Sequence, residues 1–185
     1  EEGRVEFLKK GMRLDLGAIA KGYAADALAD VLAGENIAYG ILDLGGNVLC
    51  YGHKPNGQPW SVGIQDPQKE RGNILGTISI DGGSVVTSGV YERYFEEDGR
   101  RYHHLLDPET GYPAEKGLLS VSIVSQSSTL ADAWATALFV AGPERARALL
   151  AEKPEIQAIM VFENRDIWLS PSLQNSFRLY NSAYR

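Results

Sequence analysis

Several segments of the chain alternate apolar and polar side chains with the period of a β-strand, whose successive side chains point to opposite faces. The alternation is clearest in residues 60–64 and 74–80. Short apolar or β-prone runs predict further strands at residues 5–8, 37–44, 48–52, 91–95, 101–105, 118–124, 156–162 and 166–169. The pattern therefore predicts a protein dominated by short strands.

Residues 18–33 follow a helical pattern instead. Apolar side chains recur there at every fourth position, which places them on one face of a helix, and Gly34 is a suitable stop. This apolar stripe consists of Ile19, Tyr23, Ala27 and Val31, with Ala24 and Leu28 beside it.

Two more helices are predicted in the second half of the chain. Ser127 or Thr129 can cap a helix over residues 130–140, because a side-chain oxygen there accepts from the free N–H groups of the first turn. Gly142 and the proline after it end this helix, and a second helix follows over residues 143–152.

The connections between strands are mostly turns of hairpin length. Turn-forming residues lie at 55–59, 81–83, 97–99 and around Asn164. Few connections are long enough for a helical crossover, which parallel strands would require. The predicted fold class is therefore α+β, with a largely antiparallel sheet and a few packed helices, and not a doubly wound parallel sheet.

Composition narrows the function classes. The 185 residues are 44% hydrophobic and 23% charged, which is typical of one globular unit and excludes a disordered or collagen-like chain. The net charge of −6 gives no broad basic surface for nucleic acid. Cys50 is the single cysteine, so internal disulfides and multi-cysteine metal sites are excluded.

Asp15, Gly17 and Lys21 surround the start of the first predicted helix. The free N–H groups of a helix start attract phosphate, and Lys21 could add a positive charge. A structural interpretation is at least as common, with Asp15 as the helix cap and Lys21 as a solvated side chain. The segment is neither a P-loop nor a dinucleotide-binding glycine fingerprint.

A glycine pair, Gly45-Gly46, follows the predicted strand that ends near Asp43. Paired glycines let a ligand or another backbone come close, although they also form ordinary tight turns.

His103 and His104 are adjacent in a predicted strand. Strand alternation sends them to opposite faces, so they are not expected to share a metal ion, and one histidine at a site with the other on the surface is the favoured arrangement. The residues that follow, 107–111, have ordinary turn chemistry.

Asp132 and Thr136 are four residues apart on a predicted helix, so their oxygen atoms share one face. The alanines around them allow another backbone to approach, and oxygen ligands suit Mg²⁺. Alternatively, Asp132 stabilises the helix N-terminus and Thr136 bonds its own backbone, and spacing alone leaves both interpretations open.

Taken in order, these segments resemble the FAD:protein FMN transferase (ApbE) family. The resemblance runs from residue 14 to about residue 142 and rests on five short motifs, each unspecific alone. The motifs are residues 15–24, Gly45-Gly46-Asn47, Thr87-Ser88-Gly89 with Tyr91-Glu92-Arg93, residues 104–113, and Ala131-Asp132 with Ala135-Thr136-Ala137.

The resemblance implies an activity and its requirements. Family members use Mg²⁺ and FAD, attach FMN to a threonine or serine of an acceptor flavoprotein, and release AMP. Some relatives instead act as FAD pyrophosphatases that give FMN and AMP. A flavin-binding protein without turnover is the alternative outside the enzyme class.

The resemblance also implies roles for individual residues. Mg²⁺ would be held by the carbonyl of Ala18 and the side chains of Asp132 and Thr136. FAD would be contacted by Asp15, Lys21, His104 and Leu106. His104 and Asp132 would be the catalytic residues, with His104 near the reacting phosphate.

Two departures from the family pattern bear on the site. Only 13 residues precede Leu14, whereas the family has a substantial segment there that helps to enclose the flavin. Residues 1–185 are therefore expected to be a single flavin-transferase domain and the C-terminal part of a longer protein. Asn47 stands where the family often has Asp.

The resemblance further implies an extracytoplasmic location, periplasmic or at the cell surface, with a membrane tether outside these residues. No nucleic-acid partner is expected.

Overall fold

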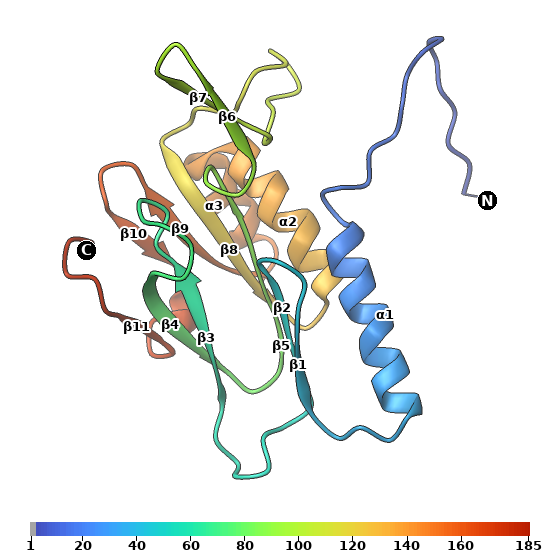
Figure 1. Ribbon diagram of the computed structural model, residues 1–185, viewed down its shortest axis with the longest axis vertical. Coiled ribbons are helices and arrows are strands. Elements are labelled where there is room, and N and C mark those ends of the chain that lie inside the picture. Colours follow the sequence, from blue (N-terminus) through green and yellow to red (C-terminus); the bar gives the residue numbers. More distant parts are fainter. Residues whose placement is uncertain (1–2) are drawn as a thin grey trace.

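The computed structural model describes residues 3–185 as three stacked layers (Figure 1). The middle layer is a six-stranded antiparallel sheet in the order β1-β2-β5-β8-β9-β10. Its strands are β1 (Gly40–Asp43), β2 (Asn47–Tyr51), β5 (Gly83–Gly89), β8 (Leu118–Ser125), β9 (Gln157–Phe162) and β10 (Ile167–Leu169).

Helices cover one face of this sheet, and a small second sheet covers the other (Figure 1). The helices are α1 (Ala20–Gly34), α2 (Ser128–Ala141) and α3 (Pro143–Ala151). The second sheet, in the order β11-β4-β3, contains β3 (Trp60–Gln65), β4 (Ile74–Ile80) and β11 (Phe177–Leu179). A separate hairpin pairs β6 (Tyr94–Glu97) with β7 (Arg100–His103), and a 3-10 helix spans Pro171–Leu173.

Strand β9 shows why the core has two parts. Ala158 and Met160 pack with α2 and α3, whereas Ile159 and Val161 pack with the small sheet. Since both faces of β9 are buried, its sequence is an apolar run and does not alternate. The predicted α+β class with antiparallel pairing is confirmed.

The helix signals in the second half of the chain are confirmed as well. Ser127 caps α2, and its Oγ accepts from the N–H of Leu130 at 3.2 Å. Gly142 ends α2 with φ 83°, a backbone conformation that favours glycine. None of the three described helices has the length and apolarity needed to cross a membrane.

Four sequence predictions about elements are wrong or incomplete. Residues 81–83 form no hairpin, because β4 before them belongs to the small sheet and β5 after them to the large one. Residues 5–8 form no strand; they are exposed and pair with no other strand of residues 3–185. The strand expected over residues 37–44 is only β1. Strand β11 was not anticipated, because Phe177–Leu179 is too short to show a period.

The predicted helix α1 is present, but its apolar stripe does not face the protein core. Tyr23 is 67% and Val31 59% exposed, whereas Gly22 and Ala25 are the buried residues of α1. Small residues therefore make the contact with α2, which allows the two helices to approach closely.

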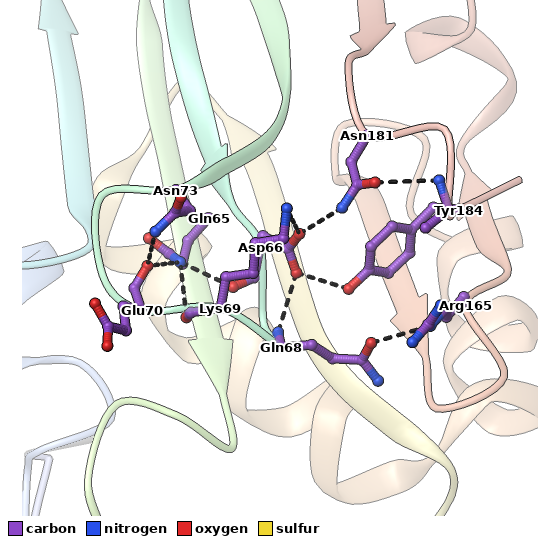
Figure 2. A network of polar contacts seen from close by, with 10 residues as sticks. Gln65, Asp66, Gln68, Lys69, Glu70, Asn73, Arg165, Asn181 and Tyr184 are labelled. Carbon is purple, nitrogen blue, oxygen red and sulfur yellow. Dashed lines mark hydrogen bonds and ion pairs between the residues drawn. The ribbon is translucent and has the colours of Figure 1, made fainter.

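The loop between β3 and β4 is fixed by a polar network centred on Asp66 (Figure 2). Asp66 is 1% exposed, and its carboxylate accepts from Tyr184 Oη at 2.7 Å, Asn181 Nδ2 at 2.8 Å and the N–H of Gln68 at 3.0 Å. Burial by itself would raise the pKa of Asp66, but these donors together lower it. The loop is thereby tied to the last residues of the chain.

Candidate functional site

The first side of the candidate site is the turn that leads into α1. Asp15 Oδ1 accepts from the N–H of Gly17 at 2.7 Å, which is an Asx turn. Asp15 is therefore not the helix cap: the cap position belongs to Ile19, which makes no side-chain capping bond. The carboxylate of Asp15 stabilises the turn that contains Ala18.

Helix α1 crosses α2 at Gly22. The N–H of Gly22 donates to Asp132 Oδ2 at 2.9 Å, across 110 residues of sequence. Farther along α1, Asp26 accepts from the N–H groups of Ser128 and Thr129 at 2.8 and 2.9 Å and so caps α2 from outside. This crossing places the first half of α1 against the first turns of α2.

Asp132 is buried at this crossing, with 4% of its surface exposed. Burial is the dominant effect and raises its pKa, while the N–H of Gly22, the charge of Lys21 and the nearby Asn47 amide oppose this. Among residues 3–185 no lysine, arginine or histidine forms an ion pair with this buried carboxylate, which suits it to bind a cation.

Thr136 lies one turn farther along α2 and contacts Ser88 Oγ at 3.1 Å. Asp132 bonds Gly22 and does not stabilise the N-terminus of α2. Neither side chain therefore adopts the alternative structural role considered from the sequence. Both point from α2 toward neighbouring elements of the site.

Lys21 is half-buried, and its Nζ donates to the carbonyl oxygen of Gly45 at 3.2 Å. The glycine turn itself is closed, because Asp43 Oδ1 accepts from the N–H groups of Gly45 and Gly46 at 3.0 and 3.4 Å. The N–H groups of Gly45 and Gly46 are therefore not available to bind a phosphate. Positive charge for a phosphate at this turn must come from side chains.

Asn47 lies directly behind the glycine turn and is fully buried. Its Oδ1 accepts from Ser128 Oγ at 2.7 Å, while its Nδ2 has no hydrogen-bond partner within residues 3–185. The amide lies near enough to Asp132 to lower the pKa of that carboxylate slightly, although the two groups do not form a hydrogen bond.

The two histidines point in different directions, as strand alternation predicts, but His103 is not on the surface. His103 is 6% exposed and meets the Phe139 ring edge-on, with 5.6 Å between ring centroids. His104 follows the end of β7, and its Nδ1 lies 3.2 Å from the carbonyl oxygen of Arg93.

A carbonyl oxygen can only accept, so the proton of a neutral His104 belongs on Nδ1 and the lone pair on Nε2. Partial desolvation lowers the pKa of His104, and the charges of Arg93 and Lys21 act in the same direction. The ring is therefore neutral at pH 7.

Leu106 lies in the loop after His104 and is 52% exposed. It pairs with Pro113 in an isolated bridge, and the N–H of Asp107 donates to the carbonyl of Tyr112 at 2.8 Å. The segment forms a closed turn with an apolar side chain facing outward.

The oxygen atoms near Asp132 fit a hard divalent cation. Gly22 lies in the first turn of α1, where N–H groups have no partner within the helix, and its N–H donates to Asp132. The carbonyl of Ala18, just before the cap position, accepts no hydrogen bond from residues 3–185. Carbonyl, carboxylate and hydroxyl oxygens are the donors that Mg²⁺ prefers. In the described part of the chain no three His, Cys, Asp or Glu side chains converge, so Asp132 would be the only carboxylate among these oxygen ligands.

One hollow lies outside the set of predicted site residues. A space of about 560 Å³ lies between the second half of α1 and strands β2 and β5; Asp26 and Ser127 line it, but none of the site residues predicted from the sequence does. A second hollow of about 360 Å³ adjoins the glycine turn and is lined by residues of the β3–β4 loop and by Tyr91, Glu92, Tyr94 and Arg101. Arg71 of this loop is absent from the site residues predicted from the sequence, because its position depends on tertiary contacts.

Substitution of Gly22 tests the helix crossing. In Gly22→Ala, the added Cβ would overlap the Ser128 carbonyl oxygen and lie 2.8 Å from Cβ of Asp132, so the helices must separate. We expect a loss of about 1–3 kcal/mol in the free energy of unfolding and weaker binding of Mg²⁺. Gly34→Ala is the control, since its Cβ meets nothing within 4 Å. Equal stability of the two variants would contradict the close crossing.

Known proteins are similar to this chain in both sequence and structure. The model of the ApbE family matches residues 1–160. A Klebsiella pneumoniae protein named FAD:protein FMN transferase is 45% identical over 180 residues, and a Treponema pallidum protein of the same name is 41% identical over 188 residues. The ApbE protein of Thermotoga maritima has a similar crystal structure, with a TM-score of 0.82 and 39% identity.

The shared region is a part of each relative. It covers 97% of this chain in both sequence comparisons but 55% and 52% of the two relatives, and 91% of this chain but 55% of the T. maritima chain. The chain thus spans about half the length of the curated relatives it matches.

Proposed function

The chain belongs to the ApbE family, and from this premise we propose that it takes part in the transfer of FMN from FAD to a threonine or serine hydroxyl of an acceptor protein. AMP is the other product. The observation that carries the proposal is the crossing at Gly22, where Asp132 and the hydroxyl of Thr136 come from α2 and the open carbonyl of Ala18 comes from the turn before α1. The proposal includes FAD as the substrate, a protein as the FMN acceptor and Mg²⁺ as the cofactor.

Mg²⁺ at Ala18, Asp132 and Thr136 would neutralise charge on the pyrophosphate oxygens. Lys21, held at the carbonyl of Gly45, supplies a second positive charge on the same side. The position of Asp15 in the turn before Ala18 and the exposed Leu106 suit contacts with the nucleotide and the flavin.

His104 suits the proton transfer. The acceptor hydroxyl oxygen forms a bond to the phosphorus of the FMN half, and the bond from that phosphorus to the bridging oxygen breaks. The electron pair of the broken bond leaves with AMP, and the hydroxyl proton passes to Nε2 of His104. A neutral imidazole with Nδ1 bonded to Arg93 is the form that accepts a proton at Nε2.

A mass-spectrometric assay tests the function. The protein is incubated with FAD, Mg²⁺ and a purified acceptor domain, and with the same domain after Thr→Val substitution at its target position. FMN on the first domain alone supports transfer. Free FMN together with AMP would contradict transfer and show that the protein is an FAD pyrophosphatase. Intact FAD that co-purifies with the chain would indicate a binding protein without turnover.

A further inference from the structure

We propose that Arg71 is a further phosphate-binding residue of this site, and that Asp66 and Tyr184 position it. The inference rests on the proposed function, because the phosphate belongs to the pyrophosphate of the nucleotide. Arg71 lies in the β3–β4 loop, outside all the segments that carry the family resemblance.

The location of Arg71 relative to Lys21 is the first observation. Arg71 Nη2 lies 4.0 Å from the point where a Cβ on Gly45 would stand, and Lys21 Nζ donates to the carbonyl oxygen of the same Gly45. Two positively charged side chains, one from α1 and one from the small sheet, therefore reach the same turn.

The charge of Arg71 is available, which is the second observation. The other cations of the adjoining hollow are engaged: Lys69 lies 3.9 Å from Asp66, and Arg101 pairs with Glu96 at 3.1 Å. Within residues 3–185 the guanidinium of Arg71 takes part in no ion pair or hydrogen bond.

Acidic groups are also present at this turn. Asp43 is committed to the N–H groups of Gly45 and Gly46, and Glu92 Oε1 lies 3.5 Å from the Cβ position of Gly46. Because the backbone N–H groups are occupied, a phosphate here must be neutralised by side chains. A guanidinium offers paired donors that match phosphate oxygens.

The loop around Arg71 is held rigidly, which is the third observation (Figure 2). Gln65 Nε2 donates to the carbonyl of Glu70 at 3.1 Å, and Gln65 Oε1 accepts from the N–H of Gly72 at 2.9 Å. The residues on both sides of Arg71 are therefore fixed by the same side chain. A fixed loop lowers the entropy cost of binding.

Asp66 connects this loop to the C-terminal segment. Its carboxylate accepts from Tyr184 Oη and Asn181 Nδ2, and its carbonyl oxygen accepts from Gln65 Nε2 at 2.8 Å. Tyr184 and Asp66 do not line the candidate site. They are positioning residues, whose effect on nucleotide binding passes through Arg71.

Calorimetry with ADP, FAD and riboflavin on the 185-residue chain tests the assignment. In Arg71→Gln, we expect ADP and FAD to bind roughly 5- to 20-fold more weakly, as for the loss of one charge-assisted hydrogen bond near the surface, with no change for riboflavin, which has no phosphate. Arg178→Gln is the matched control, because Arg178 is an exposed arginine on β11 that stacks near Tyr180.

A double-mutant cycle tests the positioning role. Tyr184→Phe removes the hydroxyl that bonds Asp66 and is expected to weaken ADP binding roughly 2- to 5-fold in the parent. In the Arg71→Gln background it should have no further effect on ADP. Additive effects would show that Tyr184 acts by general stability, and would overturn the positioning role.

The outcomes separate this inference from the proposed function. Unchanged ADP affinity in Arg71→Gln overturns the inference that Arg71 binds phosphate. If the KM for the acceptor domain rises instead, Arg71 binds the acceptor. A parent chain that binds ADP through Arg71 but transfers no FMN leaves the inference standing and removes the function. A parent chain that binds neither ADP nor FAD overturns both.

Discussion

Asp132→Asn is expected to abolish Mg²⁺-dependent FMN transfer and at the same time to raise the thermal midpoint of the metal-free chain. The loss of activity, about 10³-fold or more, follows because the amide cannot supply the negative charge that holds the cation, and a bound cation contributes several kcal/mol to a phosphoryl transition state. The amide oxygen still accepts from the N–H of Gly22, so the helix crossing is kept.

The gain in stability follows from the sign of the pKa shift. Burial raises the pKa of Asp132 in the folded chain above its unfolded value, so the ionised carboxylate destabilises the fold at any pH above the unfolded pKa of about 3.9. Removing the charge relieves this effect at pH 7. At about pH 3, where both states hold the proton, the difference between the variant and the parent should vanish.

Thermal unfolding with and without Mg²⁺ measures both parts. Mg²⁺ should raise the midpoint of the parent and leave that of Asp132→Asn unchanged, since only a ligand of the folded state stabilises it. Asp30→Asn, an exposed carboxylate on α1, is the control. An Asp132→Asn chain that still responds to Mg²⁺ would show that the cation binds elsewhere.

His104→Ala is expected to lower turnover by roughly 10²- to 10⁴-fold with little effect on stability, the range for a positioned acid–base group. Its neighbour should behave in the opposite way. His103→Ala removes a buried ring that packs against Phe139 and is expected to reduce the free energy of unfolding by about 1–3 kcal/mol. Its turnover under conditions where it is folded should remain close to that of the parent.

The pH profile gives a separate test of His104. Its pKa is lowered, so kcat/KM should fall on the acid side with a midpoint below about 6.5, the ordinary histidine value. This limb should be absent in His104→Ala and retained in His103→Ala. Equal losses of turnover in the two variants would contradict the role given to His104.

Local signals in the sequence predicted the elements that local interactions specify. Ser127 and Gly142 mark the ends of α2 through a capping bond and a positive φ, both of which depend on nearby residues. The hairpin turn at residues 97–99 is equally local. Residues 81–83 have the same kind of turn signal but connect the small sheet to the large one, because β4 and β5 pair with other strands. Residues 5–8 have the composition of a strand but no partner strand in the described part of the chain, and strand formation depends on pairing.

The residues of the candidate site could be proposed from the sequence, but their burial and contacts could not. The i, i+4 relation of Asp132 and Thr136 correctly placed both on one face of α2. The burial of Asp132 could not be predicted, because it depends on Gly22, 110 residues earlier in the chain. Likewise, His103 is buried because Phe139 happens to cover it, and strand alternation gives only the direction of its side chain.

The link between Asp66 and Tyr184 also bears on the order in which the molecule folds. It joins residues 118 positions apart, and contacts of such separation form late because closing a long loop costs more entropy than closing a short hairpin. The hairpins and helices can thus form before the β3–β4 loop is fixed. In hydrogen exchange during refolding, the N–H groups of Gln68 and Gly72 should gain protection after those of β8 and β9, so that Arg71 reaches its final position in one of the last steps.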